Sequence, residues 1–318
     1  MIKKITNYFK LVYKMPGKVE LLFSSMNRQD YDLKNSKVIV GKLFSELNNQ
    51  KKEIRSLQEV EFQVFSQWGD DGIIQYLINN IDIPNKTFVE FGVENYKESN
   101  TRFLLINDNW SGLVIDGSKN NIDFITKDLV SWAHELHAVH SFITKENINS
   151  LLSEFLSKGY EKEIGILSVD IDGNDYWVWD KINVVNPIIV ISEYNSIWGS
   201  DNSWTIEYNP SFVRGNSNSS SHIYYGASLL SLCDLAEAKG YYFIGCNSNG
   251  NNAYFIRKDK IGKFKPLDPH EGYVVSKFRE LVNDDGTRVS GKDRFKSLIG
   301  MSVYNTRTNT IEIIKNED

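Results

Sequence analysis

The sequence predicts an α/β fold: a doubly wound, mostly parallel seven-stranded sheet with one antiparallel edge strand and an N-terminal helical extension. Three observations lead to this prediction. Nearly continuous apolar runs alternate with helix-forming segments over 87–194. Turn residues bound the runs. The last two runs are separated only by a Ser-Asn-Gly turn, so they should pair as an antiparallel hairpin.

Seven strand candidates follow one another along the chain. They are rich in Val, Ile, Phe and Tyr, and most are apolar without strict alternation, which indicates strands covered on both faces. The candidates span 87–93, 111–117, 137–143, 164–171, 187–194, 241–247 and 252–258.

Helical segments lie between these strands. The stretch GIIQYLINNI (72–81) places its apolar residues on one side of a helix, and Pro84 follows it. Another helix is expected over 226–240, ending at Gly240. Crossover helices between the first five strands are expected within 99–108, 118–136, 144–159 and 176–182.

The chain divides into three predicted parts: a helical N-terminal extension (1–60), a main domain (61–260) and a C-terminal extension packed on it (261–318). Apolar residues recur at spacings of three and four near the end of the first part. This pattern leaves two interpretations open, a helix that pairs with a second copy to form a homo-oligomer and an amphipathic helix that caps the main domain. The positions are Val40, Leu43, Leu47, Gln50, Ile54 and Leu57.

An irregular insertion, 195–224, follows the fifth strand and is rich in Asn, Ser and Trp. Long irregular loops in compact domains are commonly functional. Open α/β sheets bind ligands beyond the carboxyl ends of their strands, so we expect this insertion to be a lid or substrate wall. Trp198 and Trp204 within it would suit stacking on a sugar.

The composition is that of a soluble globular protein, with 41% apolar and 24% charged residues among 318. A net charge of -5 argues against a nucleic-acid partner. Two cysteines, Cys233 and Cys246, are too few for a disulfide framework and fit a reducing, cytoplasmic location. No apolar stretch near the N-terminus is long enough for a signal peptide or a transmembrane segment.

The loop after the first strand bears on the cofactor. A dinucleotide fold needs G-x-G-x-x-G here, but only Gly92 is present, with Glu94 and Tyr96 at the other glycine positions. S-adenosylmethionine has no phosphate and is a cation, so acids suit it. Glu90 and Asp116, at the ends of the first two strands, are expected to face its amino-acid part and its ribose hydroxyls. The candidate cofactor set is Glu90, Gly92, Asn100, Asp116, Ser118 and Asp170.

Acidic residues also end the fourth and fifth predicted strands. Asp170 and Asp172 stand at the end of the fourth strand, and Glu193 stands at the end of the fifth. Such an oxygen-rich cluster suits a divalent cation such as magnesium, which would lower the pKa of a bound hydroxyl. Alternatively, the acids hold the cofactor amine or the acceptor, with Asp172 as a catalytic residue. A purely structural interpretation has Asp172 forming a turn and Asp175 capping the next helix.

His222, near the end of the insertion, is a candidate general base, and the alternative is a loop histidine without a role. Polar and aromatic residues around the insertion are candidates for binding the substrate. These candidates are Glu193, Tyr194, Asn195, Tyr224 and Tyr225.

Six stretches carry a resemblance to a known family. They are FSQWGDDGIIQYLI, FVEFGVENYKESNTRFLL, WSGLVIDGS, LSVDIDGNDYWVW, ISEYNSIWG and GYYFIGCNSNGNNAYFIR. Over 62–258 the chain resembles class I, FkbM-related methyltransferase-like proteins, found with bacterial surface-polysaccharide and secondary-metabolite genes. The resemblance implies a Rossmann-like sheet, S-adenosylmethionine as cofactor, and a surface glycan or its nucleotide-linked precursor as acceptor. It does not cover the N-terminal 60 residues or the tail.

The sequence therefore predicts an S-adenosylmethionine-dependent methyltransferase that acts on a small molecule or glycan, with O-methylation of a sugar hydroxyl as the expected reaction. Two other functions stay open. One is a non-catalytic methyltransferase-like module that binds a partner through its N-terminal helix. The other is a dinucleotide-dependent, nucleotide-sugar-modifying enzyme, which the missing glycines disfavour.

Overall fold

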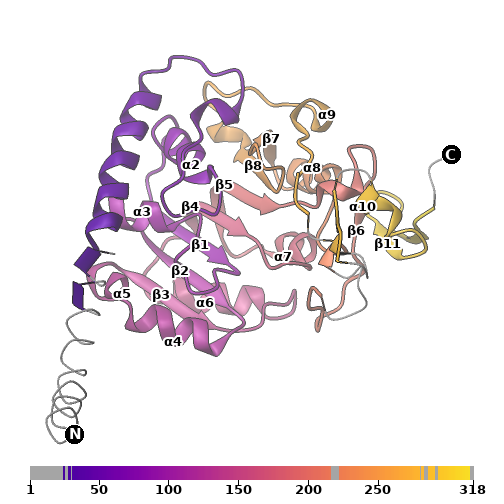
Figure 1. Ribbon diagram of the computed structural model, residues 1–318, viewed down its shortest axis with the longest axis horizontal. Helices are drawn as coiled ribbons and strands as arrows, with labels where there is room; N and C mark the ends of the chain where they lie inside the picture. Colours follow the sequence, from indigo (N-terminus) through magenta and orange to yellow (C-terminus); the bar gives the residue numbers. More distant parts are fainter. Residues whose placement is uncertain are drawn as a thin grey trace, which may run out of the picture.

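The computed structural model describes residues 24–25, 28–29, 31–215, 222–279, 281–282, 286–290 and 293–315 of the chain. Its centre is a seven-stranded sheet in the order β3-β2-β1-β4-β5-β8-β7, with helices on both faces (Figure 1). The strands are β1 (Thr87–Phe91), β2 (Ser111–Asp116), β3 (Leu136–His140), β4 (Glu163–Val169), β5 (Asn186–Glu193), β7 (Tyr241–Cys246) and β8 (Asn252–Arg257). All seven predicted strands are confirmed, with ends shifted by a few residues.

The strand directions match the prediction of a mostly parallel sheet. The neighbours β3, β2, β1, β4 and β5 pair in parallel. The antiparallel strand is β8, which pairs with both β5 and β7. It lies one place in from the edge, which β7 occupies. A short turn predicts that β7 and β8 pair, but it does not determine which of them contacts β5.

Helices bury both faces of the sheet, because neighbouring strand residues point to opposite sides. Phe88 packs in one apolar cluster and Val89 in the other. The cluster around Val89 includes residues of α6 (Ile148–Leu156), α7 (Asp175–Lys181) and α8 (Leu229–Ala238). The other cluster includes residues of α2 (Asp70–Ile78), α3 (Arg102–Asn107), α4 (Lys119–Lys127) and α5 (Leu129–Ala133). Because β3, β2, β1, β4 and β5 run in the same direction, their carboxyl ends lie along one edge of the covered sheet.

A long helix over 31–49 runs along the side of the domain, coloured indigo to purple in Figure 1. Small residues face the domain: a Cβ on Gly41 would lie 2.4 Å from Val64. Ser45 donates a hydrogen bond to Gln75 (2.9 Å). The helix ends at residue 49, so the prediction of one apolar seam from Val40 to Leu57 is wrong. Small side chains let the helix approach closely, while the apolar positions face outward.

The outward side of this helix is unusually apolar. Leu43 is 56% exposed and Leu47 is 47% exposed. Large exposed apolar groups are common singly, but a row of them on one helix is typical of a surface that contacts another molecule. Pairing with a second copy stays a prediction. The part of the N-terminal extension over 1–23 lies outside the described residues.

The insertion and the C-terminal extension combine into one small unit at the right of Figure 1. The short strand β6 (Trp204–Thr205) pairs with β11 (Ser302–Asn305), which pairs with β12 (Thr310–Ile313). Trp198 is buried in the core of this unit and Trp204 packs on it, so the prediction that they stack on a sugar is wrong. The segment 216–221 of the insertion lies outside the described residues.

Several short elements complete the chain. They are η1 (Leu57–Val60), η2 (Ser196–Trp198), η4 (Lys258–Lys260), α9 (Pro269–Gly272), β9 (Leu281–Val282), β10 (Arg288–Val289) and α10 (Asp293–Lys296). A search of the described residues finds no helix with the length and apolar character needed to cross a membrane.

Candidate functional site

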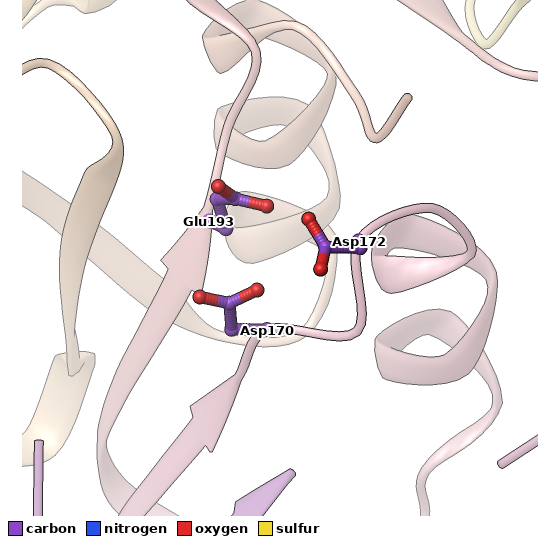
Figure 2. Close-up of side chains that lie close together, drawn as sticks. All are labelled: Asp170, Asp172 and Glu193. Carbon is purple, nitrogen blue, oxygen red and sulfur yellow. The ribbon is translucent and has the colours of Figure 1, made fainter. Parts of the chain in front are cut away.

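Three carboxylates converge at the carboxyl edge of the sheet. Asp170 follows β4, Asp172 lies in the turn toward α7, and Glu193 is the last residue of β5. Figure 2 shows the three side chains directed toward one another, and one oxygen of each lies within 4.8 Å of the others. Because β4 and β5 are parallel neighbours, their ends meet at one edge. The convergence predicted from the sequence is present.

Burial and neighbouring acids disfavour the charged forms of two carboxyls in this cluster. Burial, followed by the charges of neighbouring acids, raises the pKa of Asp170 and of Glu193 well above the ordinary values of their carboxyls. Asp172 is more exposed and forms an ion pair with Arg214. The Arg214 guanidinium also lies over the ring of Tyr225, 3.6 Å from its centroid. Glu193 Oε2 is buried and has no hydrogen-bond partner within the described part of the chain.

An open cavity of about 490 Å³ lies at this cluster. It is bordered by the ends of β1, β4 and β5, by the segment before α2, and by the C-terminal extension. A smaller cavity of about 160 Å³ adjoins it, since both share Gly92, Glu94, Asp170 and Asp172 as lining residues. Asp116 and Phe142 line the smaller one. The larger cavity is of a size that binds small molecules, and the smaller one lies directly beside it.

Gly92 stands at the junction of the two cavities and admits no side chain. Its φ is +68°, in the left-handed region that favours glycine. A Cβ at this position would lie 1.8 Å from the carbonyl oxygen of Asp170. The loop after β1 and the end of β4 therefore approach each other more closely than any other residue would permit.

Asp116 ends β2, as predicted, and its carboxylate organises the loops around the smaller cavity. It accepts hydrogen bonds from the backbone N–H groups of Glu94 (2.8 Å) and Ser118 (2.7 Å), and from the Asn121 amide (3.0 Å). Ser118 caps α4 by accepting from Asn121 N–H, and it lines neither cavity. The cofactor role predicted for Ser118 is therefore not supported by its position.

Glu90 is buried, and the loop before α3 uses both of its carboxylate oxygens. They accept from the backbone N–H groups of Asn100 (2.9 Å) and Thr101 (3.1 Å), and from the hydroxyls of Ser99 and Thr101. Desolvation raises the pKa of Glu90, and these hydrogen bonds oppose the rise. Glu90 and Asn100 both line the larger cavity. The sequence did not indicate this loop-holding role, because the partners lie nine to eleven residues further along the chain.

Asp175 also differs from its prediction as a helix cap. Asn174 occupies the N-cap position of α7, and Asp175 is the first residue of the helix. Its carboxylate accepts from Ile171 N–H (2.7 Å) and Gly173 N–H (2.9 Å). It therefore holds the turn that carries Asp172, whose backbone adopts a left-handed φ of +57°.

Several predicted substrate residues lie away from both cavities. Tyr194 and Asn195 are buried, and they hydrogen-bond backbone carbonyls of the C-terminal extension and the insertion. Tyr224 donates to the Ser302 carbonyl. Tyr225 is also buried, and its ring lies under the Arg214 guanidinium. Of this predicted substrate set, Glu193 alone lines one of the two cavities.

His222 is exposed and lines neither cavity. Its backbone carbonyl accepts a hydrogen bond from Arg214 Nε (2.8 Å). The structure therefore does not bring the predicted base to the acidic cluster. The prediction used only the position of His222 near the end of the insertion, and that position does not determine where an irregular loop places a side chain.

Other cavity residues escaped sequence reasoning. Trp68 stacks on Phe278, with ring centroids 5.5 Å apart and an interplanar angle of 29°. Arg214, Arg279 and Arg288 line the same cavity. Phe278 and the last two arginines belong to the tail, where the sequence carried no readable periodicity. Trp68 lies in FSQWGDD, part of a stretch that carries the family resemblance, so that motif could have identified it as a candidate.

No protein-family model and no curated protein matches the chain. Solved structures with a similar fold include a provisionally named caffeoyl-CoA O-methyltransferase from Staphylococcus aureus, at 15% identity and a TM-score of 0.38 over 72% of this chain and 98% of that one. The O-methyltransferase from Bacillus cereus in complex with SAH has 11% identity and a TM-score of 0.36 over 70% and 89%. PKMT2 from Rickettsia typhi in complex with AdoHcy has 10% identity and a TM-score of 0.36 over 56% of this chain.

The chain spans about half the length of the Rickettsia typhi protein, 51%. At these TM-scores the fold assignment rests on the chain's own strand order and pairing. That order defines a doubly wound, Rossmann-like α/β protein with its candidate site at the carboxyl edge of the sheet.

Proposed function

We propose that this protein is an S-adenosylmethionine-dependent methyltransferase that methylates an oxygen atom of a small hydroxylated acceptor. The main support is the pair of adjoining cavities that meet at Gly92. The adenosine part would occupy the smaller cavity, beside Asp116 and Phe142. The methionine part and the acceptor would share the larger one, beside the acidic cluster.

The charge of the site fits this cofactor. Glu94 and Asp170 line both cavities, Glu90 lines the larger one, and Asp116 lines the smaller one. Acids favour a cationic ligand with a free amine and oppose a pyrophosphate at the same place. A dinucleotide would also need close backbone approach at positions that Glu94 and Tyr96 occupy. The alternative of a dinucleotide-dependent enzyme therefore has no support from the geometry.

Bound S-adenosylmethionine supplies a methyl group on a positively charged sulfur. The protein has to orient the acceptor oxygen, exclude water and accept one proton. We assign proton acceptance to the pair of Asp170 and Glu193 in place of His222. Burial raises the pKa of both carboxyls, so each binds a proton at a higher pH than an ordinary carboxyl does. This pair is the catalytic base of the proposal, and Asp172 positions Arg214.

Unpartnered polar atoms support a hydroxylated acceptor. Trp68 Nε1, Glu193 Oε2 and Asn252 Oδ1 are buried atoms without hydrogen-bond partners among the described residues, and the residues that carry them line the larger cavity. Asp70 accepts from the Asn252 amide nitrogen (3.0 Å), which leaves Oδ1 as an acceptor. Hydroxyl groups both donate and accept, so a sugar complements this set. The resemblance to glycan-associated methyltransferases supports the same choice.

Titration calorimetry of the full-length protein with S-adenosylhomocysteine tests the proposal. Asp116→Ala removes the carboxylate expected to bind the ribose hydroxyls, at about 1.5–3 kcal/mol for each charge-assisted hydrogen bond. The matched control is Asp123→Ala, because the Asp123 side chain is 47% exposed and pairs with Lys119. We expect weaker binding only in Asp116→Ala, with thermal unfolding recorded for both variants. A wild-type protein that gives no heat would instead be a non-catalytic methyltransferase-like module.

The acidic cluster also suggests a second role, the binding of magnesium by Asp170, Asp172 and Glu193. Their facing oxygens and the unpartnered Glu193 Oε2 support it, while Arg214 already supplies a positive charge beside Asp172. A metal there would stabilise the acceptor oxygen as it loses its proton. Methyl transfer would then fall with a chelator and return with added magnesium. Full activity in the chelator would remove the metal and leave the carboxyl pair as the base.

A further inference from the structure

Two arginines of the C-terminal extension stand at the larger cavity. Arg279 precedes β9, and Arg288 lies in β10, opposite Val282 of β9. Both side chains are exposed. Each donates to the other's backbone carbonyl, from Arg288 at 2.8 Å and from Arg279 at 3.4 Å. Neither forms an ion pair with a carboxylate in the described ranges, and the two guanidinium groups are held together at the cavity by these hydrogen bonds.

The acids and these two arginines come from different elements of the cavity wall. The acids Glu90, Asp170 and Glu193 lie at the ends of strands β1, β4 and β5, while the two arginines come from the β9–β10 ribbon. Like charges held side by side repel each other unless an opposite charge binds them. The planar guanidinium fork matches the oxygens of phosphate, which makes arginine pairs suited to that group.

An aromatic surface lies next to the arginine pair. Phe278 directly precedes Arg279 and stacks on Trp68. Both aromatic rings line the cavity, and Trp68 is only half-buried. Apolar faces of sugar rings and nucleobases pack well on such side chains. One wall of the cavity therefore combines positive charge with a flat apolar surface.

From these observations, and resting on the proposed methyltransferase function, we propose that the acceptor is a sugar that carries a phosphate or diphosphate group. Arg279 and Arg288 bind the phosphate oxygens, and the sugar packs against Trp68 and Phe278. The hydroxyl to be methylated reaches the carboxyl pair. A cavity of about 490 Å³ is within the range that holds a ligand of this kind.

Inorganic pyrophosphate is the probe for this proposal. Its affinity for the full-length protein is measured by titration calorimetry, with and without saturating S-adenosylhomocysteine. We expect Arg279→Ala and Arg288→Ala each to weaken pyrophosphate binding about tenfold, equal to about 1.4 kcal/mol. Binding should also weaken with added salt. The matched control is Arg55→Ala, because the Arg55 side chain is 96% exposed and lies outside the cavity.

Two outcomes would overturn the inference without touching the proposed function. One is wild-type protein that binds S-adenosylhomocysteine but gives no heat with pyrophosphate in either condition. The other is an equal loss of S-adenosylhomocysteine affinity in the Arg279 and Arg288 variants, because the arginines would then bind the cofactor's carboxylate. Both residues are exposed, so thermal unfolding of the variants should match that of the Arg55→Ala control.

Discussion

Gly92→Ala tests the close approach that separates the two cavities. The substitution has two costs. An alanine at a φ of +68° costs about 1–2 kcal/mol for the left-handed backbone. The added Cβ would also lie 1.8 Å from the Asp170 carbonyl oxygen, far inside contact distance, so the β1 loop and the β4 end must separate. Forced overpacking of this kind costs about 1–3 kcal/mol.

The chain offers a control that isolates the second cost. Gly240, just beyond α8, has a φ of +87°, and an alanine Cβ there would meet no heavy atom within 4 Å beyond its chain neighbours. Gly240→Ala therefore bears only the cost of its backbone conformation, about 1–2 kcal/mol. Gly92→Ala should be less stable than Gly240→Ala by about 1–3 kcal/mol. Because the β1 loop and β4 border both cavities, only Gly92→Ala should also lose affinity for S-adenosylhomocysteine.

Urea unfolding followed by circular dichroism measures the stability difference, with the midpoint compared at constant m-value. Titration calorimetry measures the affinity. Equal stability losses in the two variants would refute the reasoning, because the contact with the Asp170 carbonyl would then carry no cost. Unchanged ligand affinity in a folded Gly92→Ala protein would refute the placement of the ligand across this junction.

Two further predictions concern stability and assembly. Burial raises the pKa of Asp71 from 3.8 to about 6. The protonated side chain therefore stabilises the folded state fully below pH 4, and this contribution is lost as the pH rises through 6. The free energy of unfolding should fall by about 3 kcal/mol over that range. Asp71→Asn keeps an acceptor for the N–H groups of 64–66, so its stability should change less with pH over that range. Urea unfolding measures both proteins, and parallel stability–pH curves for the wild type and the variant would contradict this. If the exposed face of the 31–49 helix pairs with a second copy, Leu43→Glu should lower the mass found by light scattering and Glu46→Ala should not. An equal mass for all three proteins would exclude association through this face.

Much of the sheet was predictable because its signals are local. Each buried strand is a short apolar run, and the helices between them show apolar residues at helical spacing. The meeting of Asp170 with Glu193 was also predictable, since parallel neighbours end at the same edge of a sheet. Asp116 was placed correctly at the end of β2 for the same reason.

The sequence by itself therefore determined the strands, the parallel direction of the first five, and the acids at their carboxyl ends. Only the tertiary structure decided which residues join those acids. Arg214 of the insertion and Arg279 of the tail both line the cavity, and the insertion pairs with the tail through β6 and β11, a contact of two residues on each strand between segments about a hundred positions apart. His222 of the same insertion lines neither cavity. Such a pairing leaves no periodic pattern, because its stability comes from side chains packed together in space rather than from neighbours along the chain.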